Sequence, residues 1–559
     1  MKPAFPFRFR PRLLDSLKDY SLRRLQADLL AGVTVGIVAL PLAIGFGIAS
    51  GASPAAGIYT AIIGGAIVSA FGGSRVQIGG PAGAFVGLVY TIILQYGMPN
   101  LVICTILAGV LLFIFGAAGL GSLIKYIPHP VTTGFTCGIA ITIISTQVKD
   151  FLGLRLAEVP ADFIGKVAAF TRTLPTLSWP TLAVGAASIA VIQFWPKSWA
   201  RRVPGSIVAV VAGTALAHLF KLPVVTIGER FGDAGIPHGL PAFLLPVIDF
   251  HHIGVLIRPA VAIALLGSIE SLLSAVVADG MIDGRHDSNQ ELMAQGLANF
   301  TVPFFGGIPV TGVLARTATN IRSGATSPIA GLVHSLTLLA IVLLAAPLAR
   351  FIPLTVLGAV LIVVSLKMGE WDEFLLLRQQ AKSDAAVFLV TFVLTVVFDL
   401  TVAVEVGMIL AAFLFIQRVS DATEVDALDQ ISTEAGIFGH ERVPDLPPGV
   451  LVYRVFGALL FGAVDKLDTA LRRGNAEANV VILHLAAVIA IDATAINALD
   501  ILHEKLKRHG RQLVLSGART QPRSLMEKTG LLARLGDENV CPDLAAAVAR
   551  ARLLLALPT

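Results

Sequence analysis

The chain has 559 residues, of which 55% are hydrophobic and 14% are charged, and its mean hydropathy is +0.79. This composition excludes an ordinary soluble domain and indicates a polytopic membrane protein. We attribute the formal net charge of +5 to basic residues at the inner membrane surface, not to nucleic-acid binding. The three cysteines, Cys104, Cys137 and Cys541, are too few and too scattered for a disulfide framework or a metal cluster.

Residues 1–28 form a basic N-terminal segment, which the distribution of Lys and Arg among the short loops places in the cytoplasm. Apolar runs follow one another over residues 29–420, and we predict about fourteen full or half membrane spans there. The longer connections, 148–178 and 221–258, then lie outside. Because the number of spans is even, both termini face the cytoplasm. We therefore predict a multi-pass protein of the cell inner (plasma) membrane.

Two apolar stretches, 78–85 and 306–316, are interrupted by glycine and proline. In lipid, a broken helix is tolerated only where its freed backbone groups line a cavity, and the N–H groups at a helix start attract negative charge. Paired broken segments in two halves of a chain are typical of inverted-repeat secondary transporters. The sequence thus predicts an anion site at mid-membrane. The alternative is that these stretches only pack helices closely together.

Near Ser420 the composition changes to an acidic, polar linker, 421–449, which ends in Pro447, Pro448 and Gly449. Residues 450–559 alternate short β-branched runs with amphipathic helical stretches, which predicts a small α/β domain. We expect its C-terminal helix to dock on the rest of the domain. The domain has no glycine-rich phosphate loop and no catalytic triad pattern, so we predict neither an enzyme nor a bound cofactor.

Several motifs, taken in order, resemble the sulfate permease family, which includes the animal solute-carrier anion exchangers and prestin. They are Ala31–Ala43, Gly57–Tyr59, Gly73–Phe85, Gly134–Ile139, Gly267–Leu273, Gln295–Asn299, and Arg316 followed by Gly324–Pro328. Ile491–Ala495 resembles the signature of the STAS domain that ends these permeases. Asp279–Met281 with Pro303–Gly307 is most similar to a bacterial branch that contains an aerobic dicarboxylate transporter.

The resemblance implies a seven-plus-seven inverted repeat followed by a cytoplasmic STAS domain. Spans 1–4 and 8–11 would form a core that moves as an elevator against a gate of spans 5–7 and 12–14. It implies secondary active transport of a small anion (sulfate, bicarbonate or a dicarboxylate) by proton-coupled symport or by exchange. It also implies a homodimer in the bilayer and a cytoplasmic protein partner at the STAS domain. The alternatives are a nucleobase permease of the same membrane fold, sodium-coupled bicarbonate uptake, and a membrane-tethered STAS scaffold that transports nothing.

The resemblance and the broken stretches together assign twelve substrate-binding residues. They are Ala82, Gly83, Ala84 and Phe85 on the first half-helix, Thr311, Gly312, Val313, Leu314, Ala315 and Arg316 on the second, and Leu42 and Phe46 on the first span. In the family a basic residue at the position of Arg316 lies beside the anion; the alternative is an arginine that snorkels to the inner surface. Many relatives have serine where Ala315 stands, which implies that Arg316 and backbone N–H groups do more of the coordination here.

Glu270 lies within an apolar span, where an ionised carboxylate costs about 2.5–3.5 kcal/mol. In the family an acidic residue on this span bears on proton coupling. We interpret Glu270 either as the proton carrier, with the Ser271 hydroxyl beside it, or as a structural ion-pair partner of a buried cation. If Glu270 is the carrier, the coupling ion is H⁺, and Na⁺ is the alternative coupling ion. No metal site is predicted.

Asp492 and Thr494 in the tail lie where a strand ends and a helix begins. A carboxylate or hydroxyl there would cap the helix N-terminus. The alternative, by analogy with the serine of anti-sigma-factor antagonists, is that Thr494 is a regulatory phosphorylation or nucleotide-responsive site.

Overall fold

The computed structural model describes residues 9–18, 20–122, 128–156, 159–160, 162–200, 203–232, 239–246, 253–398, 400–427, 446–461, 466–467, 469–470 and 478–556. The chain divides into two compact units, which we call the membrane unit (Met1–Ile409) and the tail unit (Leu410–Thr559).

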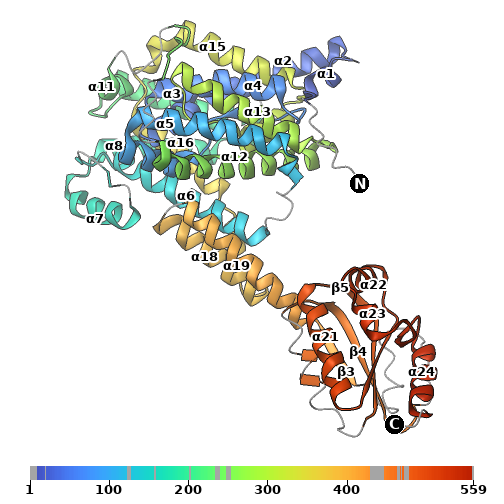
Figure 1. The fold of residues 1–559 in the computed structure, drawn as a ribbon. Coiled ribbons are helices and arrows are strands. Elements are labelled where there is room, and N and C mark those ends of the chain that lie inside the picture. Colours follow the sequence, from blue (N-terminus) through green and yellow to red (C-terminus); the bar gives the residue numbers. More distant parts are fainter. Residues whose placement is uncertain are drawn as a thin grey trace. The chain divides into compact units, whose positions relative to one another are not determined.

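The membrane unit is helical (Figure 1). Its first half contains α1 (Arg12–Ser16), α2 (Leu22–Ala49), α3 (Pro54–Tyr59), η1 (Thr60–Gly64), α4 (Gly65–Phe71), α5 (Phe85–Ala117), α6 (His129–Leu152), α7 (Phe163–Thr173), η3 (Leu174–Thr176), α8 (Trp179–Phe194), α9 (Lys197–Ala200), α10 (Gly205–Leu219) and α11 (Ile227–Phe231). Its second half contains α12 (Ile253–Ile282), α13 (Ser288–Thr301), η6 (Val302–Phe305), α14 (Leu314–Arg322), α15 (Ile329–Ala349), α16 (Leu354–Met368), α17 (Asp372–Leu376), α18 (Lys382–Val397) and α19 (Leu400–Asp421), which continues into the tail unit.

The apolar composition predicted membrane-spanning helices, and the described residues contain them. Six helices are long and apolar enough to cross a membrane, and a seventh span results if Phe163–Thr176 and Trp179–Phe194, bent by 116°, are one crossing. Further apolar helices, Gly205–Leu219 and Ile329–Leu344, are shorter. The helical membrane fold is confirmed, while the number of about fourteen spans stays a prediction.

Two short helices begin near the middle of the membrane unit. Gly97 breaks α5 with a non-helical backbone (φ 82°, ψ 165°), so the first part, residues 85–96, is about 18 Å long against a hydrocarbon core of about 30 Å. The second short helix, α14, has 9 residues. Each starts directly after one of two short strands, β1 (Gly79–Gly80) and β2 (Thr311–Gly312). The two broken stretches thus form half-helices, as the sequence predicts.

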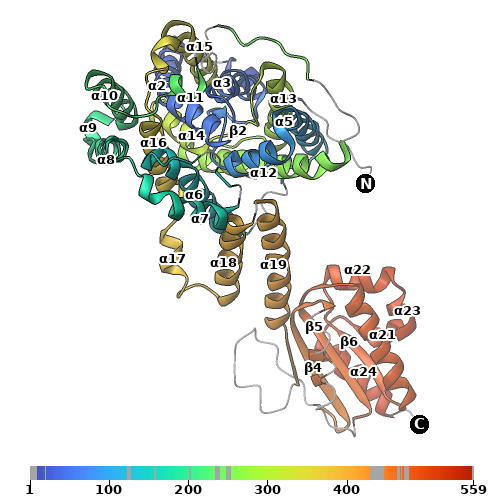
Figure 2. The same cartoon turned by 90° about the vertical axis from the view of Figure 1, so that its left-hand side faces the viewer.

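Glycines allow the helices around these strands to pack closely. A Cβ atom added at Gly296 on α13 would lie 2.5 Å from the backbone nitrogen of Phe113 on α5. Small residues at such contacts let helix backbones approach closely in a membrane. α12 also packs against α5 (Figure 2), so α5, α12 and α13 together support the two half-helices.

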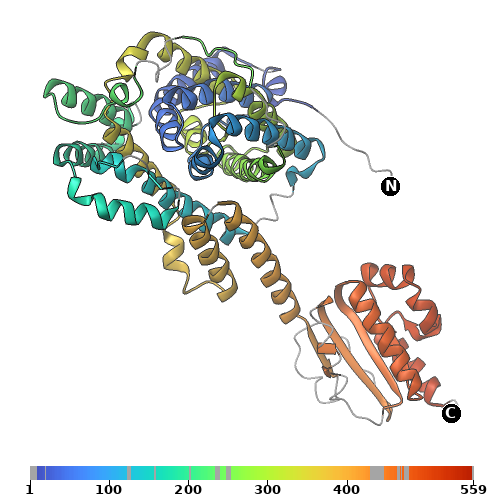
Figure 3. The ribbon, with the colours of Figure 1, turned by 60° about the vertical axis from the view of Figure 1, so that its left-hand side comes forward.

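The tail unit, orange to red in Figure 3, combines a sheet with helices. The sheet has five strands in the order β3 (Glu424–Ala427), β4 (Val450–Leu459), β5 (Val480–Ile491), β6 (Gln512–Ser516) and β7 (Val540–Cys541). The β3–β4 pair is antiparallel and the other pairs are parallel. Buried residues of α21 (Ala493–Arg508), α22 (Thr520–Lys528) and α23 (Leu531–Leu535) pack on one face, and those of α24 (Leu544–Ala556) form a second cluster with alternate strand residues. The turn η9 (Asp537–Asn539) precedes β7. The predicted α/β tail is confirmed, and its C-terminal helix docks on the sheet.

One boundary differs from the sequence interpretation. The predicted linker, 421–449, begins with residues that form β3, so the sheet starts before residue 450. The acidic composition of this stretch suggested a linker, but an edge strand tolerates charged side chains because one of its sides faces solvent. Residues 428–445 of the predicted linker lie outside the described residues.

Candidate functional site

The site begins with the pairing of the two broken stretches. β1 and β2 are antiparallel, with Gly79 opposite Gly312 and Gly80 opposite Thr311. The pairing continues where the N–H of Val313 donates to the carbonyl of Ile78 at 2.9 Å. We call residues 78–80 and 311–313 the strand junction. It brings together segments that lie more than two hundred positions apart, so the two half-helices start from a common point.

Neither half-helix is capped by a side chain. Ala84 precedes α5 and Val313 precedes α14, and neither offers a side-chain oxygen to the N–H groups of the first turn. The first N–H groups of a helix have no intrahelical acceptor and carry the positive end of the helix dipole. Two uncapped N-termini at one junction therefore present hydrogen-bond donors and partial positive charge to the same region, which suits an anion.

Arg316 adds a full positive charge behind the second N-terminus. Its side chain is 1% exposed, and its Nε, Nη1 and Nη2 atoms have no hydrogen-bond partner among the described residues. A Cβ atom at Gly80 would collide with Nη1, so the glycine lets the guanidinium pass close to the strand. Burial excludes the alternative in which Arg316 snorkels to the surface. An unpaired buried charge is costly, so this arrangement favours a negatively charged ligand.

An apolar wall surrounds the first half-helix. A Cβ atom at Gly83 would lie 3.3 Å from Cε1 of Phe46 on α2 and 2.6 Å from Cδ1 of Ile143 on α6, and one at Gly267 on α12 would lie 3.5 Å from Cζ of Phe85. The remaining predicted residues of this wall, Leu42, Ala82 and Ala84, are also buried. The structure thus brings the predicted residues of the first span and the first half-helix together. On the second half-helix Val313 is buried, whereas Leu314 and Ala315 are exposed.

The buried hydroxyls at the junction make bonds within the protein. Ser271 Oγ and Thr311 Oγ1 are 2.6 Å apart, and Ser271 Oγ accepts from the N–H of Gly312 at 3.2 Å. Thr311 Oγ1 also lies 3.2 Å from the carbonyl of Gly267. These groups fasten the junction to α12, because a strand edge inside a membrane must satisfy its polar groups within the protein. The substrate contacts of Thr311 and Gly312 and the coupling role of Ser271 stay predictions.

Glu270 precedes Ser271 on α12 and is half-buried. It lies three residues after Gly267 and four before Ser274, so it shares a helix face with residues that border the junction. Within the described part of the chain, Glu270 has neither a hydrogen-bond nor an ion-pair partner. The ion pair with a buried cation is therefore not formed in this structure, which leaves the carboxyl group available to exchange a proton.

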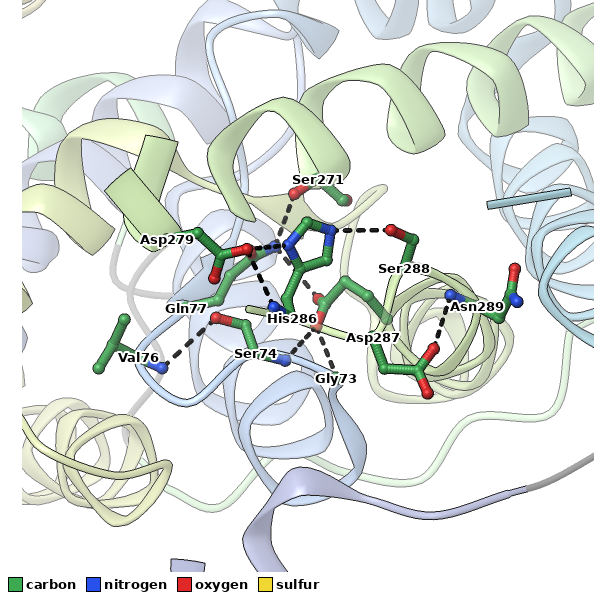
Figure 4. Close-up of polar contacts among 11 residues, drawn as sticks. Gly73, Ser74, Val76, Gln77, Ser271, Asp279, His286, Asp287, Ser288 and Asn289 are labelled. Atoms are coloured by element: carbon green, nitrogen blue, oxygen red, sulfur yellow. Dashed lines mark hydrogen bonds and ion pairs between the residues drawn. The ribbon is translucent and has the colours of Figure 1, made fainter. Parts of the chain in front are cut away.

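Glu291, which was not among the residues predicted from sequence, holds the loop before β1. The side chain is fully buried on α13, and Oε2 accepts from the N–H groups of Gly73 at 2.9 Å and Ser74 at 3.1 Å. Oε1 accepts from the side-chain amides of Gln77 at 3.1 Å and Gln295 at 3.0 Å. Gln77 also donates to the carbonyl of Ser271 at 3.1 Å (Figure 4). The loop, α12 and α13 are thereby tied together beside the junction.

A signal for this network was present in the sequence. Glu291, Gln295 and Asn299 recur every four residues, which places them on one face of a helix. Asn299 makes two bonds to Val310, at 2.7 and 2.9 Å, and so fixes the stretch before β2. A polar face on a buried helix predicts partners inside the protein, because unpaired polar groups are costly there.

Replacing Glu291 with leucine should destabilise the membrane unit. The change leaves the N–H groups of Gly73 and Ser74 without their acceptor, and each unsatisfied buried donor costs about 1–3 kcal/mol. We expect a lower melting temperature of the purified protein in detergent, with a smaller decrease for Glu291→Gln, which keeps one acceptor oxygen. Equal melting temperatures for the wild type and Glu291→Leu would contradict this account.

The tail contains the predicted cap. Asp492 Oδ1 accepts from the N–H of Ala495 at 2.8 Å at the start of α21, and Oδ2 accepts from the N–H of Phe461 at 3.0 Å. Thr494 is exposed in the first turn of the same helix. The capping interpretation is confirmed for the carboxylate, and a regulatory role of Thr494 stays a prediction.

Comparison with known proteins agrees with this architecture. Residues 25–391 match the model of the sulfate permease family, and residues 443–547 match that of the STAS domain. The chain is 39% identical over 534 residues to the putative sulfate transporter YvdB of Bacillus subtilis, covering 94% of this chain and 98% of that protein. It is 31% identical over 531 residues to the bicarbonate transporter BicA of Picosynechococcus, covering 92% of each.

A solved structure shows the same fold. The murine Slc26a9 anion transporter in the inward-facing state matches with a TM-score of 0.85 at 19% identity, over 97% of this chain and 94% of that one. At this identity the likeness speaks for the fold alone.

Proposed function

Because this chain belongs to the sulfate permease family, an anion transporter family with a C-terminal STAS domain, we propose that it is a secondary active transporter of sulfate, bicarbonate or a dicarboxylate. The observation that carries the proposal is the strand junction, where two uncapped helix N-termini and the unpaired guanidinium of Arg316 come together. Backbone N–H groups and one fixed charge can bind an oxyanion of any of these three kinds.

Energetics favour a coupled mechanism over simple diffusion. Each negative charge that enters a cell with an inside-negative potential costs about 2.3 kcal/mol per 100 mV, so a dianion would be expelled. Import therefore requires a cotransported cation or exchange for an internal anion. We assign the proton to Glu270, because its carboxyl group lies on the helix face beside the junction and has no hydrogen-bond or ion-pair partner among the described residues. Na⁺ is the alternative coupling ion.

We further propose that the core carries the anion as an elevator against the gate, that the protein works as a homodimer in the inner membrane, and that both termini are cytoplasmic. The short half-helices support the elevator proposal, because the bound anion can move with the helices that hold it. The tail, with an exposed first turn at α21, offers a surface for a cytoplasmic protein partner.

A nucleobase permease of the same membrane fold is the competing function. Such a site would present carboxylates to a neutral base. The junction here has the carboxyl group of Glu270 beside it, but it adds the buried Arg316 and two helix N-termini, which favour an anion. We propose no enzymatic activity and no cofactor.

Transport by the purified protein in proteoliposomes tests the assignment. We expect uptake of at least one of labelled sulfate, bicarbonate and succinate, suppressed by an excess of unlabelled anion and unaffected by uracil or xanthine. An imposed inward pH gradient should drive accumulation of the anion. Uptake of nucleobases that is insensitive to anions would overturn the proposal.

A further inference from the structure

A cavity of about 370 Å³ lies beside the first half-helix. Its lining includes Gly83 and Ala84, at the N-terminus of this half-helix, and follows α5 as far as Gln95 and Tyr96. Residues of α6 and α7, of the first turns of α12 and of the end of α18 line it as well. The length of α5 between Gly83 and Tyr96 is about 20 Å, so the cavity reaches well beyond the half-helix terminus.

Two cations line this cavity. Lys166 on α7 is 3% exposed, and its Nζ lies 5.6 Å from the centre of the Tyr90 ring. Arg258 on α12 is exposed and lines the same cavity. The described residues of the lining include no aspartate or glutamate, while Thr91, Gln95, Thr142 and Ser145 supply neutral polar groups.

The ammonium group of Lys166 has no hydrogen-bond or ion-pair partner among the described residues. Asp162, the nearby carboxylate on the same segment, caps α7 by accepting from the N–H of Gly165. A buried ammonium without a counter-charge costs free energy, and a Tyr ring face offsets only part of that cost. Such a group is stabilised when an anion enters the cavity.

We propose that Lys166 and Arg258 form an outer anion subsite, which takes up small oxyanions at the cavity mouth and passes them along α5 to the junction. This inference rests on the proposed function and adds two specificity-determining residues to it. Charges of one sign in a cleft with low-dielectric walls raise the local concentration of a counter-ion and its rate of entry. Lys166 and Arg258 belong to the long connections, which the sequence places outside, so the subsite serves entry from that side.

Directional kinetics with the full-length protein test the subsite. Initial uptake of labelled sulfate, with labelled bicarbonate as the second probe, is measured at low ionic strength in right-side-out and inverted membrane vesicles. The variants are Lys166→Gln, Arg258→Gln and the double variant. Arg172→Gln is the matched control, because Arg172 is an exposed cation on the same helix α7 outside the cavity lining.

We expect the double variant to raise the KM at least fivefold in right-side-out vesicles, with little change in kcat, and to leave the KM in inverted vesicles unchanged. The difference from the wild type should shrink at high salt, because ions screen the attraction. Lys166→Gln should change the melting temperature little, since it loses only the contact of the ammonium group with the Tyr90 ring and also removes a buried charge.

Three results would overturn the proposed subsite. The first is that the double variant and Arg172→Gln have the same KM in right-side-out vesicles. The second is that the double variant raises the KM equally in right-side-out and inverted vesicles, and the third is that it lowers kcat without changing the KM. If Lys166→Gln fails to fold, the KM of Arg258→Gln alone tests the subsite, because the Arg258 side chain is exposed and its replacement leaves the core intact. If the wild type transports neither anion, labelled succinate replaces them as the probe. Failure of the wild type with all three anions would instead remove the proposed function and this inference together.

Discussion

We expect Arg316→Ala to weaken the free energy of anion binding by about 2–5 kcal/mol, which raises the Kd by more than one order of magnitude. The guanidinium is fully buried beside Gly80 and has no hydrogen-bond partner among the described residues, so its charge acts on a bound anion at short range and in a low dielectric. Binding of labelled anion to the purified protein measures the loss directly. Arg316→Lys should retain part of the affinity, because it keeps the charge and loses the planar donor array.

Stability separates this effect from a structural one. Removing an unpaired buried charge breaks no hydrogen bond, so Arg316→Ala should melt at a temperature equal to or above that of the wild type without anion. Anion should then raise the melting temperature of the wild type but not of the variant. Arg322→Ala, an exposed arginine in the last turn of the same helix, is the matched control and should bind normally. Unchanged affinity in Arg316→Ala would contradict the assigned role.

Glu270→Gln should abolish accumulation driven by an inward pH gradient and preserve exchange of anion across the membrane. The substitution keeps the shape of the side chain and removes the titratable group. Since Glu270 has no ion-pair partner in the described residues, we expect the variant to fold normally. Both activities are measured on the same proteoliposomes, with labelled anion outside and with either a pH gradient or unlabelled anion inside.

Glu405→Gln is the control for this experiment, because it removes an exposed carboxyl group on α19 within the membrane unit. Its pH-driven accumulation should equal that of the wild type. Proton-driven accumulation that persists in Glu270→Gln would exclude Glu270 as the carrier. Loss of both activities together with aggregation would show that the residue supports the fold.

The most accurate sequence predictions concern features that local physics enforces. Clustered glycine and proline interrupt an apolar helix locally, so the two half-helices were predictable from stretches 78–85 and 306–316. The burial of Leu42, Phe46 and Phe85 follows from their apolar surroundings. The β-branched runs of the tail likewise predicted its strands, although the acidic residues of β3 concealed the edge strand.

The polar contacts were less accessible to sequence reasoning. Ser271 and Thr311 have hydroxyls that suit a substrate, and only their 2.6 Å separation shows that they bond each other. Glu291 lies in the polar first turn of α13. Its role as a hydrogen-bond acceptor depends on the loop at Gly73 and Ser74, more than two hundred residues earlier in the chain. A hydrogen bond requires a precise meeting of two groups, and residue type alone does not specify the partner.

The sequence by itself determined that this protein is a helical membrane protein with two broken half-spans and an α/β tail, because hydropathy, helix breakers and strand periodicity act within short segments of the chain. Only the tertiary structure decided which N–H groups stay uncapped, that Arg316 is buried without a hydrogen-bond partner among the described residues, and that Lys166 and Arg258 line one cavity with the first half-helix. These properties depend on distances between segments that are remote in sequence. The energies of charge–charge interactions, of burial and of hydrogen bonds all depend on those distances.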